Sequence, residues 1–159
     1  MAYETFHGRI LLNQWAGARY TNTVQERCIS DSMQPYTATT ENITVTVRPV
    51  YLDGQSNFAS HRFVFAYFVQ IANNGRDTVR LLRRHWLISD TTGEVKEVKG
   101  DGVVGQQPSI EPGKAHEYSS HCVLETFEGS MEGTYTLERP DGELFDVLIP
   151  KFTLRAASN

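Results

Sequence analysis

The fold is decided by residues 63–71, which read Phe63-Val64-Phe65-Ala66-Tyr67-Phe68-Val69-Gln70-Ile71. Large apolar side chains stand at every second position of this run. That is the period of a β-strand, in which successive side chains point to opposite faces of the sheet. The positions between them are also apolar in the middle of the run, so both faces are expected to be covered there. The run therefore predicts a long β-strand.

Similar runs follow along the chain, and no long helical period lies between them. The further strands are expected at residues 43–51, 79–89, 94–99, 116–124, 131–137 and 144–149. Turn signals separate them, such as Asn73-Asn74-Gly75-Arg76, Pro112-Gly113 and Pro140-Asp141-Gly142. Short strands at near-regular spacing predict an all-β protein, an antiparallel β-sandwich of about seven or eight strands.

The last run carries a proline, Pro150, and its apolar parity changes at Phe152 and Leu154. Proline has no N–H to donate to a sheet, so it is confined to edge strands, strand starts and bulges. A bulge adds one residue and shifts the alternation by one. We therefore expect this strand to lie at an edge or to carry a bulge.

Residues 1–40 differ from the rest of the chain because their apolar pattern is weak. Ile10, Leu11, Trp15 and Ala18 have the spacing of one face of a short helix. We expect an N-terminal extension that is loose or docked on the body, and a small partner-binding helix is the alternative. The run Thr37-Ala38-Thr39-Thr40 is interpreted as a link to the domain, which then begins near residue 41.

Composition narrows the class of protein. The chain has 159 residues, 40% of them hydrophobic and 21% charged, which suits one folded domain rather than a disordered chain. A net charge of −4 disfavours a general nucleic-acid binder, which needs a basic surface. Two cysteines, Cys28 and Cys122, are too few for a disulfide framework. With no secretion signal or membrane span in the sequence, a cytoplasmic location without membrane insertion is expected.

The motif Gly100-Asp101-Gly102-Val103-Val104-Gly105 matches the GxGxxG pattern of dinucleotide-binding folds. In those folds a helix follows the glycines, but here Pro108 and Pro112 prevent a regular helix from starting. Two interpretations stay open. The glycines either form a turn between sandwich strands, or their backbone N–H groups form a nest for a phosphate-type anion.

A basic cluster follows residue 79, and it includes Arg80, Arg83, Arg84 and His85. In a regular strand Arg80 and Arg84 share one face, whereas Arg83 and His85 share the other. The cluster is either a solvated sheet face or a pair of cations that faces the glycine loop and holds phosphate or a carboxylate. The candidate anion-binding residues are Gly100, Asp101, Gly102, Gly105, Arg84 and Arg80.

Other chemistry-bearing residues give weaker signals. His116 and Cys122 lie on one face of their strand and His121 on the other, so they do not converge on one metal ion. Cys122 is interpreted as a small buried side chain and Trp86 as a core residue. We find no assembled nucleophile, acid–base pair or metal cage, and expect no catalytic residue, metal site or cofactor.

The motifs together resemble the ApaG family, also known as domain of unknown function 525. The resemblance spans about residues 41–156. It rests on several strings in order, which are the run from Gly100 to Pro108, Ile110, Pro112-Gly113, Tyr118-Ser119-Ser120, Cys122, Thr126, the run from Gly129 to Tyr135, Phe145, and Ile149-Pro150-Lys151-Phe152. Upstream, Phe63-Val64-Phe65-Ala66-Tyr67 and Arg84-His85-Trp86-Leu87-Ile88 match as well. Two features depart from the family pattern: residues 1–40, and His121 where many members carry glycine.

The resemblance implies an immunoglobulin or fibronectin III-like sandwich. It also implies a link to cobalt resistance and magnesium efflux in bacteria. Similar domains in eukaryotes are attached to an F-box ubiquitin-ligase subunit and to a polymerase-interacting protein, which suggests a module that recognises partners.

Three functions follow as hypotheses. The first is a non-enzymatic module that binds a protein partner in regulation linked to divalent cations. The second is a binder of phosphate or pyrophosphate at the glycine loop. The third is a hydrolase of nucleotide phosphates, which no residue pattern supports. A homodimer is a further expectation if the strand over residues 63–71 lies at a sheet edge.

Overall fold

The structure of the protein, a computed structural model, describes residues 34–156. The expected short helix and most of the N-terminal extension fall outside these residues. Between residues 34 and 156, no helix is long and apolar enough to cross a membrane.

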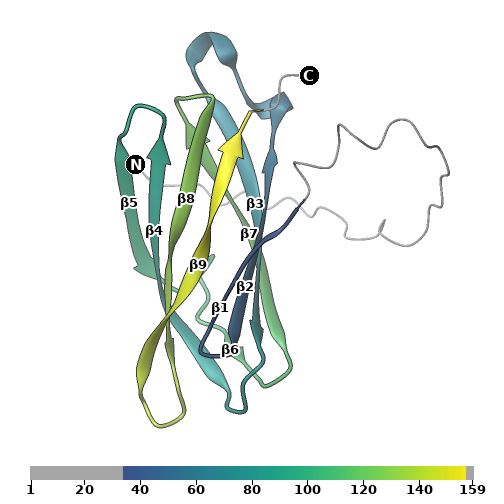
Figure 1. Ribbon diagram of the computed structural model, residues 1–159, viewed down its shortest axis with the longest axis vertical. Helices are drawn as coiled ribbons and strands as arrows, with labels where there is room; N and C mark the ends of the chain where they lie inside the picture. The colour runs from purple at the N-terminus through teal and green to yellow at the C-terminus, as the bar shows by residue number, and fades with distance from the viewer. Residues whose placement is uncertain (1–33, 157–159) are drawn as a thin grey trace, which may run out of the picture. The chain divides into compact units, whose positions relative to one another are not determined.

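Two antiparallel sheets make up the described part of the chain (Figure 1). The first sheet has the order β1-β2-β3-β7 and consists of β1 (Tyr36–Thr40), β2 (Ile43–Tyr51), β3 (Phe63–Asn73) and β7 (Ala115–Leu124). The second sheet has the order β5-β4-β8-β9 and consists of β4 (Val79–Asp90), β5 (Val95–Asp101), β8 (Glu128–Glu138) and β9 (Leu144–Arg155). The short β6 (Ser109–Ile110) also pairs with β4. Two 3₁₀ turns, η1 (Asp53–Gln55) and η2 (Phe58–Ser60), precede β3. The predicted all-β sandwich is confirmed.

The strand count exceeds the expectation, because nine strands are present in residues 34–156. One reason is that Thr37-Ala38-Thr39-Thr40 is part of strand β1 and not a link. Thr39 Oγ1 lies 2.9 Å from Thr44 Oγ1 on β2. The alternation of half-buried and exposed positions in β1 is the period-two signal, but threonine and alanine make it faint. The two-residue β6 accounts for the other extra strand.

Strand β3 lies between β2 and β7, so the edge position that would have allowed it to pair across a dimer is excluded. Its odd-numbered side chains, from Phe63 to Asn73, are buried between the sheets. On the outer face only Val64 is buried, where the segment with η1 and η2 passes and Ser56 Oγ accepts a hydrogen bond from Val64 N. Phe68 is 47% exposed. The expectation that both faces are covered is therefore wrong at Phe68.

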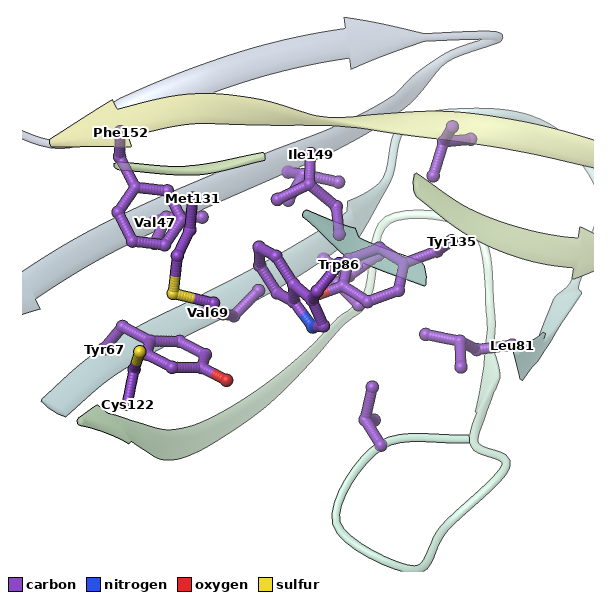
Figure 2. Close-up of a cluster of buried hydrophobic side chains, with 14 of the residues drawn as sticks. Val47, Tyr67, Val69, Leu81, Trp86, Cys122, Met131, Tyr135, Ile149 and Phe152 are labelled. Carbon is purple, nitrogen blue, oxygen red and sulfur yellow. The ribbon is translucent and has the colours of Figure 1, made fainter. Parts of the chain in front are cut away.

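Trp86 stands at the centre of the core, as predicted, with 3% of its surface exposed. Figure 2 shows its ring among side chains of both sheets. The ring centroids of Tyr67, Tyr135 and Phe152 lie 5.6, 6.2 and 6.0 Å away in edge-to-face arrangements. Such geometry adds about 0.5–1.5 kcal/mol per pair beyond the burial of apolar area. Trp86 therefore links β4 to the opposite sheet through Tyr67 of β3.

Strand β9 confirms the prediction made from Pro150. It is the last strand of its sheet, and its pairing with β8 jumps from Gly133↔Ile149 to Met131↔Phe152. Two residues of β9 thus face one residue of β8, which is the definition of a bulge. The bulge changes the parity of the strand, so Ile149 and Phe152 both reach the core.

Replacing Trp86→Ala is expected to lower the free energy of unfolding by about 3–5 kcal/mol, because it leaves a large cavity at the contact between the sheets. Leu148→Ala on the exposed outer face of β9 is the matched control and should change it by less than about 0.5 kcal/mol. Urea unfolding followed by circular dichroism measures both. Equal effects of the two changes would contradict the central role of Trp86.

Candidate functional site: the glycine loop, the tyrosine cluster and the outer face of the first sheet

Strand β4 carries a bulge that the sequence did not indicate. Leu81 pairs with Leu137 and Arg83 with the adjacent Thr136, so Leu82 is an extra residue. The bulge shifts the alternation by one. Arg84 then faces the core side, opposite the fully buried Tyr135, whereas Arg80 is exposed. The prediction that Arg80 and Arg84 share a face is therefore wrong.

Arg84 forms hydrogen bonds to backbone carbonyl groups of the glycine loop. Its Nη1 donates to the carbonyl oxygens of Asp101, at 2.9 Å, and Gly102, at 2.8 Å. Gly100 makes room for this arrangement, because a Cβ there would lie 2.9 Å from the guanidinium nitrogens. Arg84 thus positions the loop, and its cation is directed at carbonyl oxygens of the protein itself.

The rest of the motif forms a tight turn. Gly102 has a φ of +58°, and a Cβ there would lie 2.1 Å from the Gln106 carbonyl oxygen. Val103 and Gln106 exchange backbone hydrogen bonds across the turn, while Val104 and Gly105 at its tip both have positive φ. A two-residue turn of this kind is the usual connection in a tight hairpin. The turn interpretation of the glycines therefore accounts for the motif.

The turn also uses several of the donors that an anion nest would need. The N–H of Gly102 donates to the Leu82 carbonyl at 2.7 Å, and those of Val103 and Gln106 donate within the turn. On the outer side, Arg80 reaches Gln107 Oε1 at 3.2 Å. A shallow surface hollow is lined there by Arg80, Asp101, Gly105, Gln106 and Gln107. The structure thus brings Arg80, Asp101 and Gly105 together at the hollow. Arg84 does not line it, although its guanidinium bonds to the Asp101 carbonyl from the core side.

Three tyrosines that the sequence analysis did not single out as a group form a polar cluster inside the sandwich. The hydroxyl groups of Tyr118, on β7, and Tyr135, on β8, are hydrogen bonded to each other, and so join the two sheets. Burial raises the pKa of Tyr118 and Tyr135 well above the usual value, and raises the pKa of Tyr67 as well. The Arg84 guanidinium offsets part of that rise in pKa for all three. The cluster is therefore neutral at physiological pH.

The histidines and the cysteine of β7 lie as the alternation predicted. Cys122 is buried on the core side, His116 is half-buried on the same side, and His121 is exposed on the outer face. Burial raises the pKa of Cys122 to about 11 and lowers the pKa of His116. The interpretation of Cys122 as a buried small side chain is confirmed. In the described part of the chain, no group of three or more His, Cys, Asp and Glu side chains could hold a metal ion.

The outer faces of both sheets carry charged and exposed apolar side chains. On the second sheet, ion pairs join charged side chains: Glu97 lies 2.7 Å from His85 Nε2 and 2.8 Å from Lys99 Nζ. On the outer face of the first sheet lies a set of residues that we call the outer patch: Arg48, Val50, Ala66, Phe68, His121 and Val123. Val50, Phe68 and Val123 are 45%, 47% and 42% exposed. Phe68 lies between Arg48 and Ser119, and Ala66 lies between Val50 and His121. Val123 pairs with Val64, four residues along β3 from Phe68, so it lies at the far end of the patch.

A family model described as DUF525: ApaG domain matches residues 53–139, more than half of the chain. The chain belongs to the ApaG family. Among curated relatives, Protein ApaG from Paramagnetospirillum magneticum is 55% identical over 119 residues, which cover 75% of this chain and 92% of that protein. Protein ApaG from Anaeromyxobacter dehalogenans is 51% identical over 118 residues, 74% of this chain and 93% of that one.

Solved structures agree with the family assignment. A crystal structure from Bordetella pertussis, described as an ApaA protein, is 42% identical and has a TM-score of 0.70 over 77% of this chain and 96% of its own. A second X-ray structure is 37% identical, with a TM-score of 0.69 over 74% of this chain and 89% of its own. The sandwich of this ApaG domain therefore has relatives of the same fold.

The raised pKa values predict that this ApaG domain loses stability as pH rises. Folding raises the pKa of such a thiol or phenol above its value in the unfolded chain. The group's contribution to stability is fully present at pH values below the unfolded pKa, and it is lost as the pH rises from the unfolded pKa toward the folded pKa. Between pH 8 and 10 the Cys122 thiol alone should lower the free energy of unfolding by on the order of 1–2 kcal/mol, because it ionises only in the unfolded chain. Urea unfolding at intervals of pH measures this slope. The Cys122→Ala variant should show a flatter slope, and an unchanged slope would contradict the assignment.

Proposed function

We propose that this ApaG domain is a non-enzymatic module that recognises a protein partner through the outer patch of its first sheet. The supporting observation is Phe68, a large aromatic side chain that is 47% exposed on β3, an inner strand of the first sheet. Contiguous exposed apolar residues with a polar rim are typical of protein interaction sites. Aromatic side chains are also enriched among the residues that dominate binding energy.

The chemistry of the partner follows from the neighbours of Phe68. Arg48 pairs with Phe68 across β2 and β3, and within residues 34–156 its guanidinium group forms no hydrogen bond or ion pair. An arginine in this position suits a carboxylate, with which it can form two parallel hydrogen bonds. The expected partner segment therefore presents an apolar side chain for Phe68 beside an aspartate or glutamate for Arg48.

The resemblance to the ApaG family links such a module to cobalt and magnesium homeostasis, and we place the proposed recognition there. A module of this kind regulates a partner by binding it. Its energy would come from the burial of Phe68 and its apolar neighbours, and its specificity from the Arg48 contact.

A displayed peptide library selected on the protein tests this proposal. The enriched peptides should share an apolar residue next to an acidic one. In fluorescence anisotropy, Phe68→Ser should weaken such a peptide at least about tenfold, because truncating an aromatic anchor at the centre of an interface costs more than about 1.4 kcal/mol. Arg48→Ala should weaken it less and reduce its salt dependence.

The matched control is Leu148→Ser on the outer face of the second sheet, where Leu148 is 57% exposed. It removes a similar exposed apolar area and should leave the affinity unchanged. Peptides that bind the Phe68→Ser variant as tightly as the unaltered protein would overturn the proposal, and so would a selection that enriches nothing.

A phosphate-type anion is a second candidate ligand, which is favoured by one observation. Arg80 and Gly105 line the same surface hollow, with the Gln107 side chain already bonded to Arg80. The Asp101 carboxylate in the same hollow opposes an anion. Any binding there is therefore expected to be weak and sensitive to salt.

Calorimetric titration with pyrophosphate separates the two candidates. Saturable heat that Arg80→Ala removes would support the anion site, because it deletes the cation of the hollow. Arg83→Ala, which removes an exposed arginine of the same strand, is the control and should retain the heat. Gly102→Val is unsuitable here because a side chain at Gly102 would clash with the turn itself. Absence of heat with the unaltered protein would exclude the candidate.

A further inference from the structure

Four strands form the edges of the two sheets, and three of them are protected against pairing with another chain. Strands β1 and β9 lie against each other, and Leu148 N–H donates to Thr40 Oγ1 at 3.2 Å (Figure 1). Strand β9 also carries the Pro150 bulge. Strand β5 has seven residues, among them Lys96 and Lys99. Proline, bulges and lysines are the devices with which proteins keep sheet edges from pairing with other chains.

Strand β7 is the fourth edge, and it lacks these devices. It has ten residues, with no proline, lysine or arginine among them. It pairs with β3 without a register break from Ala72↔Ala115 to Phe63↔Leu124. A long regular edge of this kind is a template for a further strand.

The pairing with β3 determines which backbone groups of β7 face outward. Asn73 N–H donates to the Lys114 carbonyl at 2.9 Å. Because hydrogen-bonded pairs alternate along an antiparallel ladder, the even-numbered residues of β7 bond to β3. The N–H and C=O groups of the odd-numbered residues then point away from the sheet, from Ala115 through Ser119 to Val123. An added strand must pair with these residues.

The side chains of these outward-facing residues are symmetric about Ser119. Glu117 and His121 lie two residues on either side of it, and Ala115 and Val123 lie four residues on either side. All five are on the outer face of the first sheet. A two-fold axis at Ser119 would set each Glu117 opposite the partner's His121 and each Ala115 opposite the partner's Val123. An axis at Ser120 would instead set Glu117 opposite the partner's Val123.

We propose that the protein forms a homodimer in which β7 pairs with β7 of a second copy, antiparallel and with the two-fold axis at Ser119. The pairing joins two four-stranded sheets into one of eight strands. It contributes backbone hydrogen bonds, two Glu117–His121 pairs and two small apolar contacts. Glu117 Oε1 accepts a hydrogen bond from Gln70 Nε2 of β3 at 2.7 Å, so a contact with the partner's His121 would use Oε2.

Two-fold dimers are the commonest oligomers, and their interfaces are self-complementary in this way. An edge-to-edge contact buries little area compared with a standard interface, so a dissociation constant in the micromolar range is expected. The dimer shares His121 and Val123 with the outer patch, but Phe68 and Arg48, on which the proposed recognition rests, lie on β3 and β2 and not on the edge strand. The two proposals can therefore fail separately.

Sedimentation equilibrium of the full chain from about 1 to 200 µM tests the dimer. The unaltered protein should shift from monomer to dimer within this range. Ser119→Pro should stay monomeric, because it removes an N–H that points outward and so spares the bonds to β3. Ser119→Ala keeps that N–H and should still dimerise. Circular dichroism with thermal unfolding confirms that both variants are folded.

A charge exchange tests the register. His121→Glu places two carboxylates opposite each other and should raise the dissociation constant about tenfold or more, since like charges directly opposite destabilise a strand pair. The double variant Glu117→Lys/His121→Glu restores opposite charges and should recover most of the affinity. An axis at Ser120 predicts no such recovery.

The proposal is overturned if the unaltered chain remains monomeric at 200 µM. It is also overturned if Ser119→Pro dimerises as the unaltered chain does, or if the double variant is no tighter than His121→Glu alone. Leu148→Ser on the second sheet should leave the dimer unchanged.

Discussion

The extra residue at Leu82 in β4 is the constraint on which the rest of this arrangement depends. On its N-terminal side Leu81 faces the core, and on its C-terminal side Trp86 does. Those two residues are five positions apart, an odd number that a regular strand cannot place on one face. The bulge solves this conflict and turns Arg84 inward. Arg84 then holds the Asp101 and Gly102 carbonyls, so the glycine loop has its shape because β4 is irregular.

The same inward turn puts the Arg84 cation near three tyrosines in a core that is otherwise mostly apolar. A buried hydroxyl without a partner costs roughly 1–3 kcal/mol, and the Tyr118–Tyr135 pair satisfies one hydroxyl with the other. This contact is directional, unlike the packing around Trp86. It therefore fixes how the two sheets lie against each other, while the edge-to-face contact of Trp86 with Tyr135 packs the core around it.

Much of the fold could be predicted from the sequence, and the reasons for the failures are physical. The alternation of β3 and the parity change after Pro150 are visible because each involves large apolar residues. The bulge at Leu82 is hidden, because arginine and leucine occur on both sides of it and either phase of the alternation looks plausible. Strand β1 was missed because threonine is common in both strands and loops. Of the candidate site, Arg80, Asp101 and Gly105 meet at one hollow, but the position of Arg84 could not be foreseen without the bulge. The exposure of Phe68 depends on which elements cross that face, which no local pattern encodes.

Strand β3 also has a consequence for how such a domain can change over generations. Its odd-numbered positions are buried between the sheets and tolerate little variation, whereas Phe68 and Gln70 on its other face are exposed. Substitutions at exposed sheet positions usually alter stability by less than about 0.5 kcal/mol. Selection can therefore act on one half of the strand without disturbing the other. Within these eleven residues, the buried positions keep the scaffold of the fold unchanged, while the exposed positions between them can diverge.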